Sequence, residues 1–299
     1  MKKYVVITGG AGFIGSNLIQ LLLKKTKLNL ISIDNYSSGT KENHINNKRI
    51  KYLKSHTKEI NKILKEYEKK IKVIFHFGEF SRITQSFKDN RKCFISNIIG
   101  SYEVINYCLK NKIKIIYSAT SASLGNNEND RHLSPYAFSK STNMNLILNL
   151  EKWVGLKYEI IYFYNVYGPK QLANSKMSAV VGIFEDCYKK NKPIPVVSPG
   201  TQTRRFTHVK DTVETCLMAW KKNNNTHYAV VNKKSYSIIE LAKLFSNKIK
   251  LMPARPGERF ESKILGSIRG RKINNIFTKN RIKNYVCEFK KVKKINKKS

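Results

Sequence analysis

A glycine-rich turn near the N-terminus constrains the fold of this chain more than any other feature of its sequence. Residues 4–8 form a short run rich in β-branched side chains, and residues 13–23 carry apolar side chains at helical spacing. Between them stand Gly9, Gly12 and Gly15. Glycine at these places allows a tight turn and lets a ligand approach the backbone. The segment therefore predicts a strand, a phosphate-binding turn and a helix.

An acidic residue stands where such a fold holds a ribose. Asp34 follows a second apolar run at 28–33. Its carboxylate would accept hydrogen bonds from both hydroxyls of an adenosine ribose and would repel a 2′-phosphate, so we expect the cofactor to be NAD rather than NADP. The alternative is a packing turn in which Asp34 caps the polar loop at 35–39. The predicted cofactor residues of this part are Gly9, Gly12, Phe13, Ile14, Gly15, Asp34 and Asn35.

Further apolar runs at 73–77, 113–117 and 158–163 alternate with stretches of helical periodicity. Buried strands that alternate with helices predict an α/β fold, a Rossmann-like doubly wound parallel sheet. We expect this NAD-binding domain to occupy residues 1–168 and to receive a return segment near 206–232. The polar, Lys-rich stretch at 35–70 is interpreted as a loop followed by a solvated helix.

The alternation breaks down after residue 169, which predicts a second, smaller α/β substrate-binding domain over 169–299. Residues 177–189 have helical periodicity, and residues 193–200 resemble a turn-rich connection. Ser237 and Glu240 have the spacing of a capping box that opens another helix. From residue 272 the sequence is basic with weak periodicity, and we expect 290–299 to be a frayed tail.

The chain is strongly basic, because 57 Lys and Arg stand against 20 Asp and Glu, a formal net charge of +37. Such a field attracts phosphates, nucleic acids and acidic membrane surfaces. The excess is mostly Lys spread along the whole chain without a nucleic-acid motif, so we expect neither a nucleic-acid nor a membrane partner. No apolar run approaches the length of a membrane span, and the five cysteines form no disulfide or zinc pattern. We therefore expect a reduced, cytoplasmic protein without a metal.

Tyr136 and Lys140 are the strongest candidates for catalysis. They stand four residues apart on one face of a predicted helix, which Ser134 and Pro135 begin. A positive neighbour stabilises a phenolate, so Lys140, helped by a nicotinamide cation, would bring Tyr136 towards a usable base. The alternative is a surface tyrosine–lysine pair, because this spacing is common by chance. Its position after the fourth strand and the hydroxyl-rich segment at 118–123 favours the catalytic interpretation.

From residue 4 to about residue 259, these motifs resemble the extended short-chain dehydrogenase/reductase family, specifically its NAD-dependent sugar epimerase and dehydratase group, typified by UDP-glucose 4-epimerase. The resemblance implies that Thr120 shares the sugar hydroxyl, that Tyr136 transfers its proton and that Lys140 also holds the cofactor ribose. These three residues form the expected catalytic triad. The resemblance adds to the cofactor residues Phe77, Gly78 and Asn97.

The same resemblance assigns a nucleotide-sugar diphosphate to the second domain. Its substrate residues are Asn165, Gln202, Arg204, Arg255 and Glu258. The two arginines would clamp the diphosphate, because a planar guanidinium matches paired phosphate oxygens in a way that Lys cannot copy. Glu258 would contact the nucleotide ribose. The alternative for either arginine is a surface salt bridge. The family also implies a homodimer that pairs the helices near 97–109 and 136–150.

Departures from the family's pattern reduce the number of reactions that the chain is expected to catalyse. Dehydratases of the group carry Asp-Glu directly after the catalytic Thr, and decarboxylases carry a Glu at the second of these places, whereas Ser121 and Ala122 stand here. Epimerisation at C4 needs only one base and one hydride acceptor. The sequence therefore predicts an NAD-dependent nucleotide-sugar epimerase that acts on a UDP-hexose or UDP-N-acetylhexosamine through a transient 4-keto intermediate. Alternatives are another epimerase, reductase or dehydratase of the family and a non-catalytic dinucleotide- or RNA-binding relative.

Overall fold

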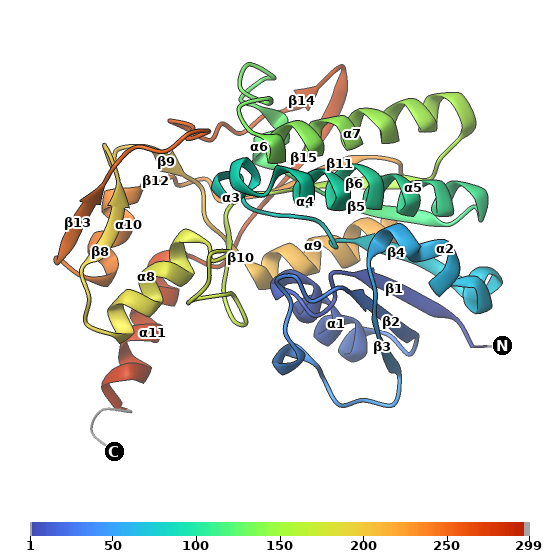
Figure 1. Cartoon of the computed structure of the whole chain (residues 1–299), viewed down its shortest axis with the longest axis horizontal. Coiled ribbons are helices and arrows are strands. Elements are labelled where there is room, and N and C mark those ends of the chain that lie inside the picture. The colour runs from blue at the N-terminus through green and yellow to red at the C-terminus, as the bar shows by residue number, and fades with distance from the viewer. Residues whose placement is uncertain (1, 296–299) are drawn as a thin grey trace.

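A sheet of nine strands runs through the centre of the computed structural model, which describes residues 2–295 (Figure 1). From one edge to the other its strands are β14 (Ser267–Ile268), β15 (Arg271–Phe277), β11 (His227–Val231), β6 (Tyr158–Phe163), β5 (Lys114–Thr120), β4 (Ile71–His76), β1 (Tyr4–Thr8), β2 (Asn29–Asp34) and β3 (Ile50–Lys54). In this sheet each neighbouring pair is parallel except β14 with β15. The predicted doubly wound parallel fold is confirmed.

Helices cover both faces of the sheet (Figure 1). The longer ones are α1 (Phe13–Lys25) and α9 (Val209–Lys222) on one face, and α5 (Ser101–Lys110) and α7 (Pro135–Val154) on the other. Side chains alternate along a strand, so Ile115 and Tyr117 of β5 pack towards α5 and α7, whereas Ile116 packs towards α1 and α9. Both faces are apolar because a parallel sheet is covered on both sides.

A smaller unit lies at one end of this sheet. Its regular elements are α8 (Val180–Lys189), β8 (Ile194–Val197), α10 (Ile238–Phe245), β13 (Ile249–Met252) and α11 (Ile282–Ile295). β8 and β13 pair in parallel, and the rings of Phe184 and Phe245 meet edge to face in its core. The predicted capping box is confirmed, because Ser237 Oγ accepts from the backbone N–H of Glu240 while the Glu240 carboxylate accepts from that of Ser237.

The remaining elements are short. They are η1 (Lys41–Asn43), η2 (Thr57–Glu59), α2 (Ile60–Ile63), η3 (Lys65–Lys70), α3 (Ile83–Lys88), α4 (Asn90–Phe94), the π-helical η4 (Ile95–Gly100), α6 (Ser121–Leu124), β7 (Val166–Tyr167), β9 (Thr203–Arg204), β10 (Thr207–His208) and β12 (Tyr236–Ser237). β7 pairs with β10, and β9 pairs with β12. These two short ribbons hold the segments that pass between the sheet and the smaller unit by backbone hydrogen bonds.

Three details of the sequence analysis are wrong. Residues 35–70 contain a parallel edge strand, β3, rather than only a loop and a helix, and its lysines hid the strand because they face solvent at the edge. Residues 193–200 contain β8, which tolerates its proline because it belongs to a two-stranded ribbon. Residues 290–295 continue α11 instead of fraying, and Lys290 Nζ donates to the Leu244 carbonyl at 3.0 Å. Residues 296–299 of the expected tail lie outside the described residues.

The chain returns to the main sheet twice after leaving it. β11 lies within the expected return segment near 206–232, and β15 makes a second return from residues that the sequence analysis assigned to the smaller domain. Among residues 2–295, no helix is long and apolar enough to cross a bilayer.

Candidate active site

A cavity of about 630 Å³ opens at the carboxyl ends of the central strands, between the sheet and the smaller unit. Here the strand order reverses, since β1 lies between β4 and β2, and ligands of open α/β sheets bind at such a switch point. The cavity wall includes the predicted cofactor, catalytic and substrate residues with the exception of Asn97. Segments far apart in the sequence therefore meet at one site.

The glycine turn leads from β1 into α1 at this cavity. A Cβ atom at Gly15 would lie 2.2 Å from the Gly9 carbonyl oxygen and 2.8 Å from Gly10 Cα, so only glycine allows this close packing of turn and helix. Gly12 is the N-cap of α1, and its neighbours Phe13 and Ile14 also line the cavity. The open N-terminus of a 13-residue helix therefore faces the space where a pyrophosphate would bind.

Asp34 ends β2 beside this turn. Its Oδ2 accepts from the Ala11 N–H at 3.0 Å and its Oδ1 accepts from the Tyr36 N–H at 2.8 Å. Burial raises the pKa of Asp34, and these backbone hydrogen bonds oppose the rise. A carboxylate oxygen can accept two hydrogen bonds, so each still has a place for a ribose hydroxyl. Asp34 can thus cap the loop and bind a ribose at the same time. Its free acceptor positions fit the ribose hydroxyls of NAD.

The loop after β4 is held by a chain of hydrogen bonds through His76. Thr8 Oγ1 accepts from the N–H groups of Phe77 and Gly78 at 3.1 and 2.9 Å, so its own proton goes to His76 Nδ1 at 2.7 Å. His76 therefore donates from Nε2 to Ser101 Oγ at 2.8 Å. Burial lowers the pKa of His76 to about 4, so the ring is neutral and serves to position the loop.

Asn97 lies behind this loop. It is fully buried on η4, where its Oδ1 accepts from the Phe80 N–H at 2.6 Å and its Nδ2 donates to the Phe80 carbonyl at 3.0 Å. Its amide also reaches Ser139 Oγ at 3.0 Å. Asn97 thus fixes the backbone of Phe80, which lines the cavity, but Asn97 itself does not line the cavity.

The predicted catalytic residues come together at the ends of β5 and α7. Thr120 is the last residue of β5, and Tyr136 and Lys140 lie one turn apart near the start of α7, where Ser134 Oγ accepts from the Ala137 N–H at 3.1 Å. Burial raises the pKa of Tyr136 to about 12, while a hydrogen bond from Thr120 lowers it. Thr120 is therefore placed to share a proton-transfer site with the phenol.

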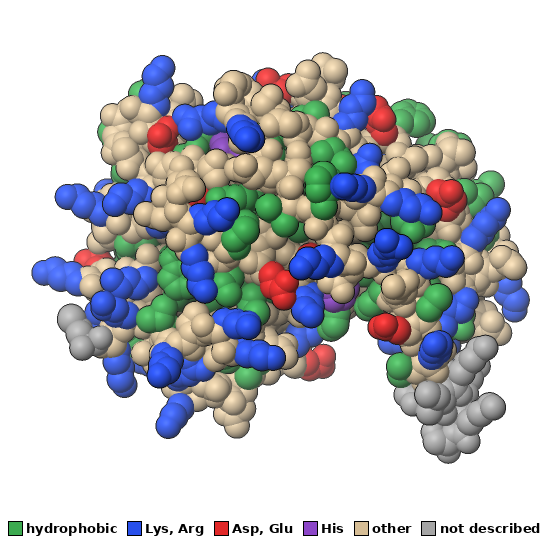
Figure 2. All heavy atoms as spheres, turned by 180° about the vertical axis from the view of Figure 1, so that it is seen from behind, with side chains coloured by type: hydrophobic (Ala, Val, Ile, Leu, Met, Phe, Trp, Pro, Cys, Tyr) green, Lys and Arg blue, Asp and Glu red, His purple; other side chains and the backbone are tan. Residues whose placement is uncertain are grey.

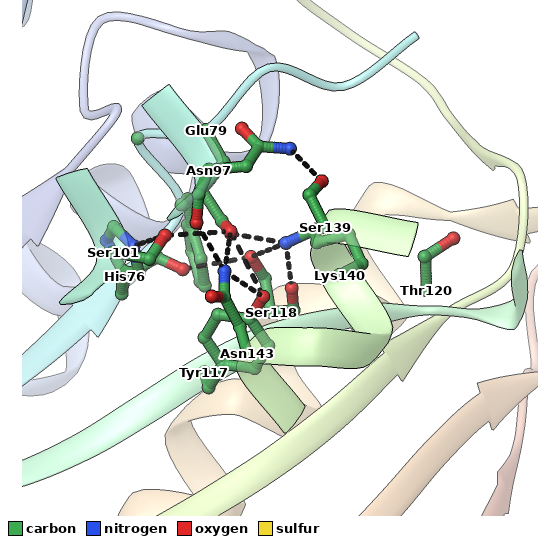
Figure 3. A network of polar contacts seen from close by, with 12 residues as sticks. His76, Glu79, Asn97, Ser101, Tyr117, Ser118, Thr120, Ser139, Lys140 and Asn143 are labelled. Carbon is green, nitrogen blue, oxygen red and sulfur yellow. Dashed lines mark hydrogen bonds and ion pairs between the residues drawn. The ribbon is translucent and has the colours of Figure 1, made fainter. Parts of the chain in front are cut away.

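Lys140 points towards a carboxylate that the sequence analysis missed. Its Nζ forms an ion pair with Glu79 and also donates to the Ser118 carbonyl, as Figure 3 shows. The sequence analysis expected Lys140 to stabilise the Tyr136 phenolate and did not predict its ion pair with Glu79. The one local signal was an acidic residue directly after the loop glycine that follows β4, in a chain with few acids.

The predicted substrate residues line the cavity from the smaller unit. Arg204 forms an ion pair with Glu258 Oε1, and Arg255 Nε donates to Glu258 Oε2 at 2.7 Å, so one carboxylate holds both predicted phosphate ligands. Gln202 is buried, and its Oε1 has no hydrogen-bond partner among the described residues although Nε2 donates to the Val197 carbonyl. An unpartnered buried acceptor on a cavity wall points to a ligand donor.

Asn165 and two further arginines complete this wall. Asn165 Nδ2 donates to the Arg205 carbonyl at 3.2 Å. Arg82 Nε donates to the Met177 carbonyl at 2.6 Å, and Arg259 donates to the carbonyl and hydroxyl of Ser121 at 2.9 and 3.1 Å. The sequence analysis missed Arg82 and Arg259 as cavity residues, because neither stands in a motif. With Arg204 and Arg255 they make the cavity suited to an anionic ligand with paired oxygens.

Comparisons with known proteins identify a family for this chain. Residues 5–232 match the family described as "NAD dependent epimerase/dehydratase family". The Bacillus subtilis protein named "Uncharacterized UDP-glucose epimerase YtcB" is 27% identical over 229 residues, 70% of each chain. A crystal structure of UDP-glucose 4-epimerase from Thermotoga maritima with UDP-glucose has a TM-score of 0.84 at 23% identity and covers 97% of this chain and 99% of that one.

A second structure is similar over nearly the whole chain. It is the UDP-N-acetylglucosamine 4-epimerase from Methanobrevibacter ruminantium in complex with UDP-N-acetylmuramic acid. Its TM-score is 0.81 at 28% identity, and the match covers 98% of each chain. The arrangement of the sheet and the smaller unit is therefore one that this chain shares with these solved structures.

Proposed function

The chain belongs to the NAD-dependent epimerase/dehydratase family, and from this premise we propose that it is a nucleotide-sugar 4-epimerase acting on a UDP-hexose or a UDP-N-acetylhexosamine. The observation that carries the proposal is that Thr120, Tyr136 and Lys140 lie on the wall of the same cavity as the glycine turn. The named activities of the relatives, on UDP-glucose and UDP-N-acetylglucosamine, support the choice of substrate.

In the proposed reaction the residues of this chain move one proton. Tyr136 takes the proton of the sugar's 4-hydroxyl and later returns it, and Thr120, on the same cavity wall, hydrogen-bonds to that hydroxyl and orients it. NAD supplies the hydride acceptor and donor when it is bound. Arg82 carries a positive charge that lowers the pKa of Tyr136 against the effect of burial. Arg204 and Arg255 hold the nucleotide diphosphate while the keto-sugar turns, and Gln202 Oε1 accepts from a donor group of the nucleotide-sugar.

The acids of the cavity favour epimerisation over elimination. In the described part of the chain, three carboxylates line the cavity, and each is engaged: Asp34 by the glycine turn, Glu79 by Lys140, and Glu258 by two arginines. Elimination of water needs an additional acid for the leaving hydroxyl. The residue two places after Thr120 is the buried, apolar Ala122, so that acid has no place there.

A proton NMR time course tests the proposal. Purified protein receives UDP-glucose, UDP-N-acetylglucosamine or their 4-epimers without added cofactor, and interconversion of at least one pair is expected because NAD is regenerated in each turnover. Tyr136→Phe should lower the rate by roughly 10²-fold or more and leave bound NAD unchanged, since the ring still packs but moves no proton. Silence of the wild type towards all four sugars, with NAD present, would refute the substrate class, and an active Tyr136→Phe would refute the assigned base.

We also propose the homodimer that the family implies. α4, η4, α5 and α7 lie on the outer face of the sheet (Figure 1), and there Ile99 and Tyr102 are 50% and 49% exposed while the rings of Phe94 and Phe138 meet edge to face. Light scattering should give twice the mass of one chain for the wild type, and the double variant Ile99→Lys/Tyr102→Lys should be monomeric. Val292→Lys, at an exposed apolar position of α11, is the control. A monomeric wild type would refute this proposal.

The positive charge does not favour a second function. Figure 2 shows Lys and Arg side chains spread across one face among other residues, without a single continuous patch. A gel shift with RNA that survives moderate salt would contradict the absence of a nucleic-acid partner, because binding through scattered lysines is strongly salt-dependent.

A further inference from the structure

Glu79 is a buried carboxylate to which the proposed mechanism gives no role. Its Oε1 accepts from Ser101 Oγ at 3.0 Å, from the Tyr117 hydroxyl at 3.0 Å and from Asn143 Nδ2 at 3.2 Å, and its Oε2 accepts from Lys140 (Figure 3). Each of these contacts is a donor, which is the environment of an ionised carboxylate. Three elements, α5, β5 and α7, thus converge on one negative charge in the loop after β4, beside the catalytic lysine.

This pair has a counterpart at the opposite end of the same strands. Lys114 at the start of β5 binds Glu159 of β6 at 2.7 Å, and three backbone N–H groups at residues 224–226 also donate to the Glu159 carboxylate. Both pairs are almost fully buried, with side-chain exposures of 6% and 0% for Lys114 and Glu159 and of 5% and 2% for Lys140 and Glu79. Only the second pair lines the cavity, so the first serves as an internal control.

The charge of Glu79 acts on two groups in the same direction. Burial lowers the pKa of Lys140, and Glu79 opposes that fall. Burial raises the pKa of Tyr136, and Glu79 adds to that rise. A negative charge favours the protonated form of any neighbouring group, so its removal should lower the pKa of the lysine and of the tyrosine together.

The other groups around the cluster keep their charge across the neutral range. The titratable groups coupled to Glu79 are His76, Cys93, Tyr117, Tyr136 and Lys140, and Arg82 and Arg259 are coupled to Tyr136. The pKa of His76 is lowered to about 4 by burial, that of Cys93 is raised to about 11 and that of Tyr117 is raised well above its ordinary value. Between the pKa values of His76 and Cys93, we therefore assign a pH-dependent change in the activity of this site to Lys140 or to Tyr136 acting as the base.

We propose that Glu79 is a positioning residue that keeps Lys140 charged and fixed against Ser118, and that it thereby sets the pH range in which Tyr136 works. The inference rests on the proposed function in one respect, because it takes Tyr136 as the base. Its effect on Lys140 does not depend on the substrate.

The pH profile of kcat tests the effect on the reaction. In Glu79→Gln, which keeps the shape and removes the charge, both limbs of the profile should move to lower pH by about one unit or more. Glu79→Asp keeps the charge and should keep the position of the wild-type profile even if kcat falls. Glu159→Gln breaks the matched pair and should leave the profile in place. A Glu79→Gln profile that is scaled down equally at every pH would assign Glu79 a merely structural role and overturn the proposal.

Labelling of Lys140 tests the inference without any turnover. Trace acetic anhydride reacts with the deprotonated amine, and peptide mass spectrometry follows acetylation of Lys140 as the pH rises. Its midpoint should lie about one pH unit or more lower in Glu79→Gln than in the wild type or in Glu159→Gln. Coincident midpoints would overturn the proposal. A wild type that labels as expected but converts no UDP-sugar would refute the proposed function and leave the role of Glu79 standing.

Discussion

Two glycines of the same turn should separate the requirements of the fold from those of the cofactor. At Gly15, an alanine methyl would lie 2.2 Å from the Gly9 carbonyl oxygen and 2.9 Å from its carbonyl carbon. These are backbone atoms, so the turn itself must shift. Overpacking of this kind costs about 1–3 kcal/mol. For a chain of this size the melting temperature should fall by about 2–4 °C for each kcal/mol.

Gly12 presents the opposite case. A methyl there meets only the Gly9 carbonyl oxygen, at 3.2 Å, and the backbone is extended with φ −79° and ψ 177°, which any residue adopts. Gly12→Ala should therefore cost the empty protein less than about 1 kcal/mol. The methyl does occupy the space in front of the helix N-terminus, so the affinity for NAD should fall about tenfold or more, about 1.4 kcal/mol.

Thermal unfolding of the NAD-free proteins and calorimetric titration with NAD measure the two effects separately. Gly15→Ala should lose both stability and affinity, whereas Gly12→Ala should lose affinity alone. Wild-type affinity for NAD in Gly12→Ala would refute the placement of the pyrophosphate at this helix terminus. An unchanged melting temperature in Gly15→Ala would refute the packing argument.

Two further predictions concern the substrate wall and acid stability. Arg204→Ala should raise the Kd for UDP about tenfold or more, because a charge-assisted hydrogen bond contributes about 1.5–3 kcal/mol, while calorimetry should show unchanged NAD affinity; an unchanged Kd would exclude Arg204 from the clamp. The free energy of unfolding should fall as the pH drops from 6.5 to 4, since burial lowers the pKa of His76 and of His227 to about 4 and the unfolded chain takes up these protons first. The loss should be up to about 3 kcal/mol for each histidine, and urea titrations of His227→Gln should show roughly half the combined loss.

The parts of the fold that were predictable from sequence are those with a strong local pattern. The first strand, the glycine turn and α1 follow from apolar spacing and from glycine, and β5 with the start of α7 brought Thr120, Tyr136 and Lys140 together as expected. β3 escaped prediction because an edge strand shows solvent a polar side. α11 escaped prediction because its lysines cover apolar surface with their aliphatic stems. Their charged ends make the apolar periodicity of the helix weak in the sequence.

The part of the site that was not predictable depends on contacts between distant residues. Glu79 and Lys140 are 61 positions apart, and no spacing in the sequence links them. Arg82 and Arg259 reach the cavity from segments without a motif, and their positions follow from the loop after β4 and from the segment after β13. A single sequence identifies groups that share a helix or a turn, but not charges that meet only after folding.

The order of strands in the sheet also bears on how this protein is made. The cofactor turn leaves the ribosome well before β11 and β15, which complete the same sheet and end at residues 231 and 277. Until they arrive, the edge of β6 carries unpaired backbone groups, and such an edge invites pairing with other chains. The nucleotide-binding half of the nascent protein therefore stays incomplete until β15 has been made. A fragment ending near residue 168 should aggregate instead of folding as a separate unit.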